Sequence, residues 1–96
     1  MVIISQDKNM IINFNSIVST YVIKNYVSEE KEYKGYNIDF ATNEEINFVL
    51  ATYETEERAK GVLQEIIKSY REYRTAVVDG YTNVLEETAV YEMPER

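Results

Sequence analysis

One stretch of helical periodicity, residues 53–74 (YETEERAKGVLQEIIKSYREYR), places the strongest constraint on how this chain folds. Thr55 can accept a hydrogen bond from a free backbone N–H at a helix start, and Glu56 and Glu57 follow where the positive end of the helix dipole favours acids. We therefore predict one long helix at about residues 55–74, roughly 30 Å in length. Its apolar stripe consists of Ala59, Val62, Leu63, Ile66, Ile67 and Tyr70.

The chain before this helix has the composition of β-strands. Short apolar runs at 2–4 and 10–14 flank a polar turn at 5–9, and residues 16–27 (SIVSTYVIKNYV) are rich in β-branched and aromatic residues. Residues 28–35 are charged and lack periodicity, which predicts an exposed loop. Alternation at 36–41 predicts a strand with one buried face. After a turn at 43–45, the apolar run in 46–52 predicts a strand buried on both faces, either central or covered by the helix.

The chain after Arg74 allows two interpretations. Asp79-Gly80 between β-branched residues is typical of a type I′ hairpin, but the helix could also continue to Val78 and stop at Gly80. If the helix ends near Arg74, then Lys68, Arg71 and Arg74 gather near its negative end. In both cases residues 88–93 predict a short final strand, with Pro94 at its end or at a sheet edge.

These elements predict one α+β domain over residues 1–96. An antiparallel sheet of four to six strands packs on the long helix, and a short strand ends the chain. The sheet face opposite the helix must then be solvated or paired in a dimer. Self-association is favoured by the apolar residues of the long strand, which are Ile17, Val18, Val22, Ile23 and Val27.

Two residue types are missing from the sequence, cysteine and histidine. Their absence removes disulfides, the usual zinc ligands and the Ser-His and Cys-His nucleophile systems. No spacing favours one pair of acids for acid–base chemistry, so we expect no enzyme, no cofactor and no metal. The start, MVIISQDK, does not resemble a signal peptide, and no run approaches the ~20 apolar residues of a membrane span. We expect a cytoplasmic protein that acts in a host cell without binding a membrane.

The charge favours a protein partner over a nucleic acid. Seventeen acids against ten bases give a formal charge of −7, which repels phosphate backbones. One interpretation is a surface that imitates nucleic-acid phosphates and occupies a basic groove of another protein. The other is ordinary solubility, because a charge of this size is common in small domains. The acidic candidates for partner binding are Glu29, Glu30, Glu32, Glu54, Glu56 and Glu57.

Tyrosine is the second unusual feature, with nine residues and no tryptophan. Interfaces favour tyrosine because its ring gives contact area at low entropic cost, although it closes the rim of a small core equally well. Tyr70 belongs to the helix stripe and is assigned to the core. The candidates for an interface are Tyr33, Tyr36, Tyr73 and Tyr81.

Four segments of the chain resemble a family of small, functionally uncharacterised proteins of Gram-positive bacteria, their phages and mobile elements. These segments are IISQD at 3–7, INF at 12–14, YETEERAK at 53–60 and YEMPE at 91–95. The resemblance implies no enzymatic role. It implies a genomic setting among accessory phage functions, where small acidic anti-defence proteins are also encoded.

The leading hypothesis is a non-enzymatic, acidic protein-binding module of phage or mobile-element origin. It would inhibit a host defence protein with a basic surface, such as a CRISPR nuclease, by occluding its nucleic-acid-binding surface. The alternative is a structural module that forms a homodimer through its sheet, without an inhibitory role. A small-ligand binder or enzyme is the third class.

Overall fold

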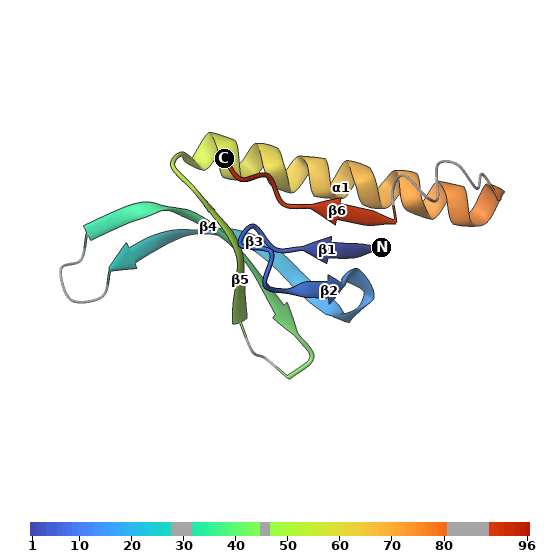
Figure 1. Cartoon of the computed structure of the whole chain (residues 1–96), viewed down its shortest axis with the longest axis horizontal. Helices are drawn as coiled ribbons and strands as arrows, with labels where there is room; N and C mark the ends of the chain where they lie inside the picture. Colours follow the sequence, from blue (N-terminus) through green and yellow to red (C-terminus); the bar gives the residue numbers. More distant parts are fainter. Residues whose placement is uncertain (28–31, 45–46, 81–88) are drawn as a thin grey trace.

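The computed structural model describes residues 1–27, 32–44, 47–80 and 89–96, without the side chains of residues 26, 27, 32, 33 and 79. Within these ranges, six strands form two three-stranded sheets beside one long helix (Figure 1). The molecule is elongated, with extents of 51 × 28 × 20 Å. The α+β class predicted from the sequence is confirmed, but the strands divide between two sheets.

Sheet A joins the two ends of the described chain. Its order is β2-β1-β6, where β1 (Val2–Ile4) pairs antiparallel with β2 (Ile11–Asn13) and parallel with β6 (Val90–Glu92). The predicted turn at 5–9 is confirmed: the Ser5 hydroxyl donates to the Asp7 carboxylate at 2.7 Å and accepts from the backbone of Met10 at 3.1 Å. A short 3-10 helix, η1 (Phe14–Ser16), follows β2. Sheet A is therefore mixed, with β6 as an edge strand next to Pro94.

Sheet B is an antiparallel meander of longer strands. β3 (Ile17–Val27), β4 (Glu32–Thr42) and β5 (Asn47–Tyr53) pair in the order β3-β4-β5. Gly35 has φ +90°, and a Cβ built on it would lie 2.5 Å from the main-chain oxygen of Tyr53. This position of β4 therefore requires glycine, because a side chain would be strained and would clash with β5.

The helix α1 (Glu56–Asp79) begins as its sequence predicts. The hydroxyl of Thr55 accepts from the backbone N–H of Arg58 at 3.1 Å, and Glu56 and Glu57 occupy the first turn. The helix ends at Gly80, whose left-handed conformation (φ +75°) and N–H bond to the Ala76 carbonyl form the C-cap. The helix continuation was thus the correct one of the two interpretations of Asp79-Gly80.

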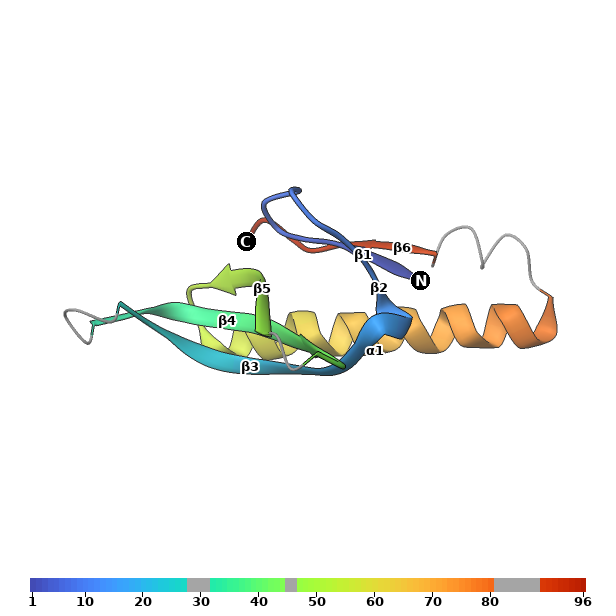
Figure 2. The ribbon, with the colours of Figure 1, turned by 90° about the horizontal axis from the view of Figure 1, so that it is seen from below.

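The core lies where α1, sheet A and sheet B meet. Figure 2 shows sheet A on one side and the β3–β4 ribbon on the other, with α1 extending past both. The predicted stripe of α1 faces this core: Ala59, Val62 and Ile66 are buried, and its other members are partly buried. The buried residues contributed by the sheets include Ile3, Ile12, Ile38, Phe40, Leu50, Ala51 and Tyr53. The ring of Phe14 packs 4.6 Å from that of Tyr70 and closes one side.

Three details of the sequence interpretation were wrong. The predicted loop at 28–35 is too long, because β4 begins at Glu32, and the remainder lies outside the described residues. The helix continues to Asp79, so its last turn holds no basic residue and Lys68, Arg71 and Arg74 lie before the region where the dipole acts.

The third error concerns β5, which is an edge strand of sheet B and is not buried on both faces. Phe48 and Val49 are 39% and 49% exposed. Leu50 is an extra residue in the ladder, because Ile38 pairs with Ala51 whereas Asp39 pairs with Val49. This bulge lets Leu50 and Ala51 both enter the core, so a continuous apolar run does not require two-sided burial here.

Candidate protein-binding surface

The outer face of sheet B, on the side opposite α1, is partly exposed over the described residues, although Asn37 within it is buried. Ile38 and Phe40 point to the core, so their neighbours Asn37 and Asp39 point to the opposite face. The strand register aligns Tyr21, Asp39 and Val49 in one row across this face, and Ile23, Asn37 and Thr52 in the next. We call these six residues the outer face. Ile23 and Val49 keep 46% and 49% of their surface exposed.

Hydrogen bonds between side chains hold the polar groups of the outer face. The Thr52 hydroxyl donates to the amide oxygen of Asn37 at 2.7 Å, and the Tyr21 hydroxyl donates to the amide oxygen of Asn47 at 3.0 Å. The first bond connects the neighbouring strands β4 and β5, and the second reaches across β4 from β3 to β5. These bonds orient the side chains around Asp39.

Asp39 differs from these neighbours, because its carboxylate lacks a partner. Its Oδ1 atom is buried and accepts no hydrogen bond from any described residue. Burial raises the pKa of Asp39 above its ordinary value of 3.8, since desolvation disfavours the charged form. Asp39 as a whole is only partly buried, so a donor of another molecule could pair with the accessible part of its side chain, next to Val49 and diagonal to Ile23.

The sequence analysis did not select Asp39, although one signal was available. Asp39 lies within the alternating stretch 36–41, and aspartate is depleted in strands because it pairs poorly with a pleated, half-buried surface. An acid in the middle of a predicted strand was thus an indication of a site. In the sequence Asp39 was interpreted only as a polar position of this alternation and as one of the seventeen acids.

Four of the predicted binding residues lie near the N-terminal end of α1. Glu54, Glu56 and Glu57 are exposed around the cap, and Tyr36 lies close enough to Lys60 to affect its pKa. The Lys60 ammonium is 2.8 Å from a carboxylate oxygen of Glu56; this contact and the charge of Lys60 lower the pKa of Glu56. Bases therefore offset part of the acidic charge at this end of the helix.

The other predicted residues do not join this group in the described structure. Tyr73 lies 17 positions after Glu56, about 25 Å further along the helix axis. Tyr36 and Tyr73 both pack against the core and are only partly exposed. Glu32 and Tyr33 belong to β4, without described side chains, and Glu29, Glu30 and Tyr81 lie outside the described residues.

The described side chains are close to electrical balance, with ten acids and nine bases. Lys8 with Glu95 and Arg58 with Glu65 form exposed ion pairs at 3.8 and 3.7 Å. Most of the negative charge of the chain belongs to seven other acids and one base, which are Glu29, Glu30, Lys31, Glu32, Glu45, Asp79, Glu86 and Glu87. Over the described side chains, the two signs of charge therefore nearly cancel.

A second polar cluster, the Gln6 junction, joins sheet A, β5 and the C-terminal segment. The Gln6 amide oxygen accepts from the Thr52 backbone N–H at 2.9 Å, and its amide nitrogen lies 3.0, 3.3 and 3.0 Å from the main-chain oxygens of Thr52, Pro94 and Glu95. The backbone of Gln6 also donates to the Leu50 carbonyl at 2.9 Å. The side chain of Gln6 therefore pairs with the edge of β5 as a strand would.

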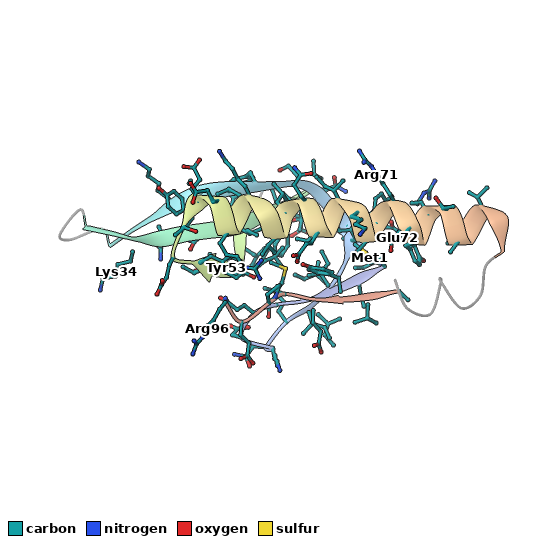
Figure 3. The ribbon with its side chains drawn as sticks, turned by 90° about the horizontal axis from the view of Figure 1, so that it is seen from above. Met1, Lys34, Tyr53, Arg71, Glu72 and Arg96 are labelled. Carbon is teal, nitrogen blue, oxygen red and sulfur yellow. The ribbon has the colours of Figure 1, made fainter. Side chains whose placement is uncertain are left out.

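Beside this junction lies a cavity of about 670 Å³ at the start of α1, and Figure 3 shows Tyr53 and Arg96 on this side of the helix. The Tyr53 hydroxyl donates to the Pro94 carbonyl at 2.8 Å, and burial raises its pKa to about 12. The Arg58 guanidinium donates to the main-chain oxygen of Arg96 at 2.9 and 2.8 Å. These polar groups form hydrogen bonds within the protein. We therefore interpret the cavity as part of the contact between α1 and the C-terminal segment and not as a ligand site.

Comparison with known proteins adds no assignment. No protein-family model, curated protein or solved structure matches the chain. Within the described ranges, no cluster of side chains has the composition and closeness to hold a metal ion. No helix in the same ranges is both long enough and apolar enough to cross a membrane.

Proposed function

We propose that this chain is a non-enzymatic module that binds a partner protein through the outer face of sheet B. One observation carries the proposal: Asp39 holds a buried carboxylate oxygen without a described partner, next to exposed Val49 and diagonal to exposed Ile23. Burying a charged group without a partner is costly, and a lysine or arginine of another protein that pairs with the accessible part of this side chain would offset the cost. Ile23 and Val49 lie beside it, where they can contact the aliphatic stem of that basic side chain.

The acids of the β3–β4 hairpin support a partner with a basic surface. Glu29 and Glu30 lie between β3 and β4 in the sequence, and Glu32 begins β4. Negative charge in this hairpin would accelerate association with a positively charged protein and make the rate sensitive to salt. Asp39 would then fix the orientation of the complex, and the hairpin acids would attract the partner.

The more specific proposal is that the partner is a host defence protein, such as a CRISPR nuclease. Proteins that bind nucleic acid carry basic surfaces, which an acidic module can occlude. The formal charge of −7 and the resemblance to proteins of phages and mobile elements support this partner class. The action would take place in the cytoplasm of the host cell, without a cofactor.

The proposal is tested by pull-down from a host lysate at low and high salt, with the tagged chain as bait. We expect a specific protein to be retained at low salt and released at high salt. Ile23→Lys should abolish retention, because it places a positive charge on the outer face. Val78→Lys is the matched control: Val78 is 76% exposed but lies near the end of α1, so this variant should retain the partner.

Circular dichroism is used to check that both variants are folded. Three results contradict the proposal: no specific protein is captured, capture is unaffected by salt, or Ile23→Lys binds as wild type does. To test the defence assignment, the captured protein is assayed for nucleic-acid binding. We expect the wild-type chain to block that binding, and unchanged binding refutes the proposed inhibition.

A further inference from the structure

The second edge of β3 has no strand beside it among the described residues. β3 is the first strand in the order β3-β4-β5, and it is eleven residues long. An edge strand presents a row of unpaired N–H and C=O groups, which readily pair with another strand. Such an edge is an interaction surface that the outer face of sheet B does not include.

Two irregularities define the part of this edge that can pair. The β3–β4 register is irregular at two places: Val18 is an extra residue of β3, and Asn25 stands against two residues of β4, Lys34 and Gly35. Between them, residues Ser19 to Lys24 pair regularly with β4. Bulges twist a strand away from a neighbour, and therefore this central stretch is the part of the edge that fits a further strand.

The charge of β3 favours a second copy of this chain as that strand. The whole chain carries a formal charge of −7, so two copies repel each other over most approaches. β3 contains no acid, and Lys24 is its one charged residue. Pairing along this strand therefore brings no acid of β3 against the other copy.

A groove beside the edge would accept side chains of the second copy. It has a volume of about 270 Å³ and lies between α1 and the start of β3. Val18, at its rim, is 63% exposed. The groove is mainly apolar, and its lining includes Phe14, Ile17, Val18, Leu63 and Ile67.

We propose that two copies pair antiparallel through Ser19–Lys24 of β3, about a two-fold axis perpendicular to the sheet. The two copies of sheet B then form one six-stranded sheet, and each copy places an aliphatic side chain at the groove of the other. The outer face with Asp39 stays open in this dimer. The proposal is therefore independent of the proposed function, and either one can fail alone.

Light scattering coupled to size-exclusion chromatography tests the dimer. We expect wild type to have twice the chain mass of 11.3 kDa, and Val18→Glu to be a monomer, because it puts a charged carboxylate at the apolar groove that would receive a side chain of the other copy. Ile11→Glu is the matched control, since Ile11 is 71% exposed on β2 of sheet A, and it should remain a dimer. The proposal is overturned if wild type is a monomer, if Val18→Glu remains a dimer, or if Ile11→Glu becomes a monomer.

Cross-linking tests the register in which the two β3 strands pair. It also tests whether the dimer exists if Val18→Glu does not fold. The chain has no cysteine, so a single introduced thiol can pair only with its copy. A two-fold axis near the centre of Ser19–Lys24 passes at either Tyr21 or Val22, and that residue then lies opposite its own copy, about 5 Å apart, within reach of a disulfide. We expect Tyr21→Cys or Val22→Cys to form a covalent dimer on oxidation, and Ile11→Cys to stay monomeric under denaturing conditions. The arrangement is refuted if neither Tyr21→Cys nor Val22→Cys forms a covalent dimer, or if Ile11→Cys cross-links equally well.

Discussion

Gln6 and Asp39 are two polar side chains that differ in how far their hydrogen-bonding groups are paired. The amide of Gln6 reaches four main-chain groups of β5 and the C-terminal segment. The carboxylate of Asp39 has one buried oxygen without a described partner. The first arrangement stabilises the fold, whereas the second reduces stability unless something else binds.

In a chain whose sequence has no catalytic motif, this difference distinguishes polar side chains that stabilise the fold from polar side chains that are candidates for binding. A satisfied polar network fixes one arrangement of the chain, whereas a buried acceptor without a donor lowers the stability of the fold. The Gln6 junction connects segments that lie far apart in the sequence, so we expect it to control folding. The outer face of sheet B lies on one continuous meander, so Asp39 can be altered without disturbing the rest.

The largest expected effect is on stability at the Gln6 junction. Gln6→Leu removes the side-chain bonds to Thr52, Pro94 and Glu95 and leaves the Thr52 N–H without its acceptor. We expect the free energy of unfolding to fall by about 2 to 4 kcal/mol, measured by urea denaturation. Gln64→Leu, on the exposed side of α1, is the control and should change stability by less than about 0.5 kcal/mol. Equal effects at Gln6 and Gln64 would show that the junction does not hold the sheets together.

A smaller loss is expected at Gly35, which contacts the same part of β5. Gly35→Ala places a Cβ 2.5 Å from the main-chain oxygen of Tyr53 at φ +90°, so we expect destabilisation of about 2 kcal/mol. Gly61→Ala is the matched change in α1, where nothing lies within 4 Å, and it should stabilise by about 1 kcal/mol. Thermal denaturation of both variants measures the difference. A neutral Gly35→Ala contradicts the close contact between β4 and β5.

The smallest effect on stability is expected at Asp39, and it has the opposite sign. Asp39→Asn replaces a partly buried carboxylate by a neutral amide, so the free energy of unfolding at neutral pH should rise by less than about 1 kcal/mol. The gain is small because the carboxylate is only partly shielded from water. Urea denaturation at several pH values measures it, and a clear loss of stability would mean that Asp39 has an internal partner.

The pH dependence of this gain follows from the raised pKa. The folded chain holds the Asp39 proton more tightly than the unfolded chain, whose carboxyl has its ordinary pKa near 3.8. The stabilising contribution of Asp39 is therefore present below that pH and is lost as the pH rises through the higher folded pKa. The difference between Asp39→Asn and wild type should vanish in acid and be largest at neutral pH. A difference that grows in acid contradicts the direction of the shift.

The sequence predicted the elements with strong local signals. Thr55 and the apolar stripe located the start and buried face of α1, and alternation at 36–41 located the buried face of β4. Local patterns could not show that the strands form two sheets, because the parallel pairing of β1 with β6 joins the two ends of the described chain. They also could not show the bulge at Leu50, which depends on the pairing with β4.

The candidate site was less predictable for the same reason. Charge and tyrosine content selected acids and rings throughout the chain, and the structure places Tyr36 and Tyr73 against the core. Asp39 became a candidate only when the register placed Ile23 and Val49 beside it and its Oδ1 atom was found without a partner. A single sequence contains the residues of such a site, but their proximity depends on strand pairing.

The most direct test of the account is the retention of the captured partner by Asp39→Asn at low salt. Glu72→Gln, which removes an exposed acid of α1, gives the same change in net charge and serves as the reference. If the outer face of sheet B binds a basic side chain, Asp39→Asn loses at least tenfold in affinity, about 1.4 kcal/mol, while Glu72→Gln binds nearly as wild type does. Equal affinity of the two variants would contradict a specific role for Asp39 and leave only general electrostatic attraction.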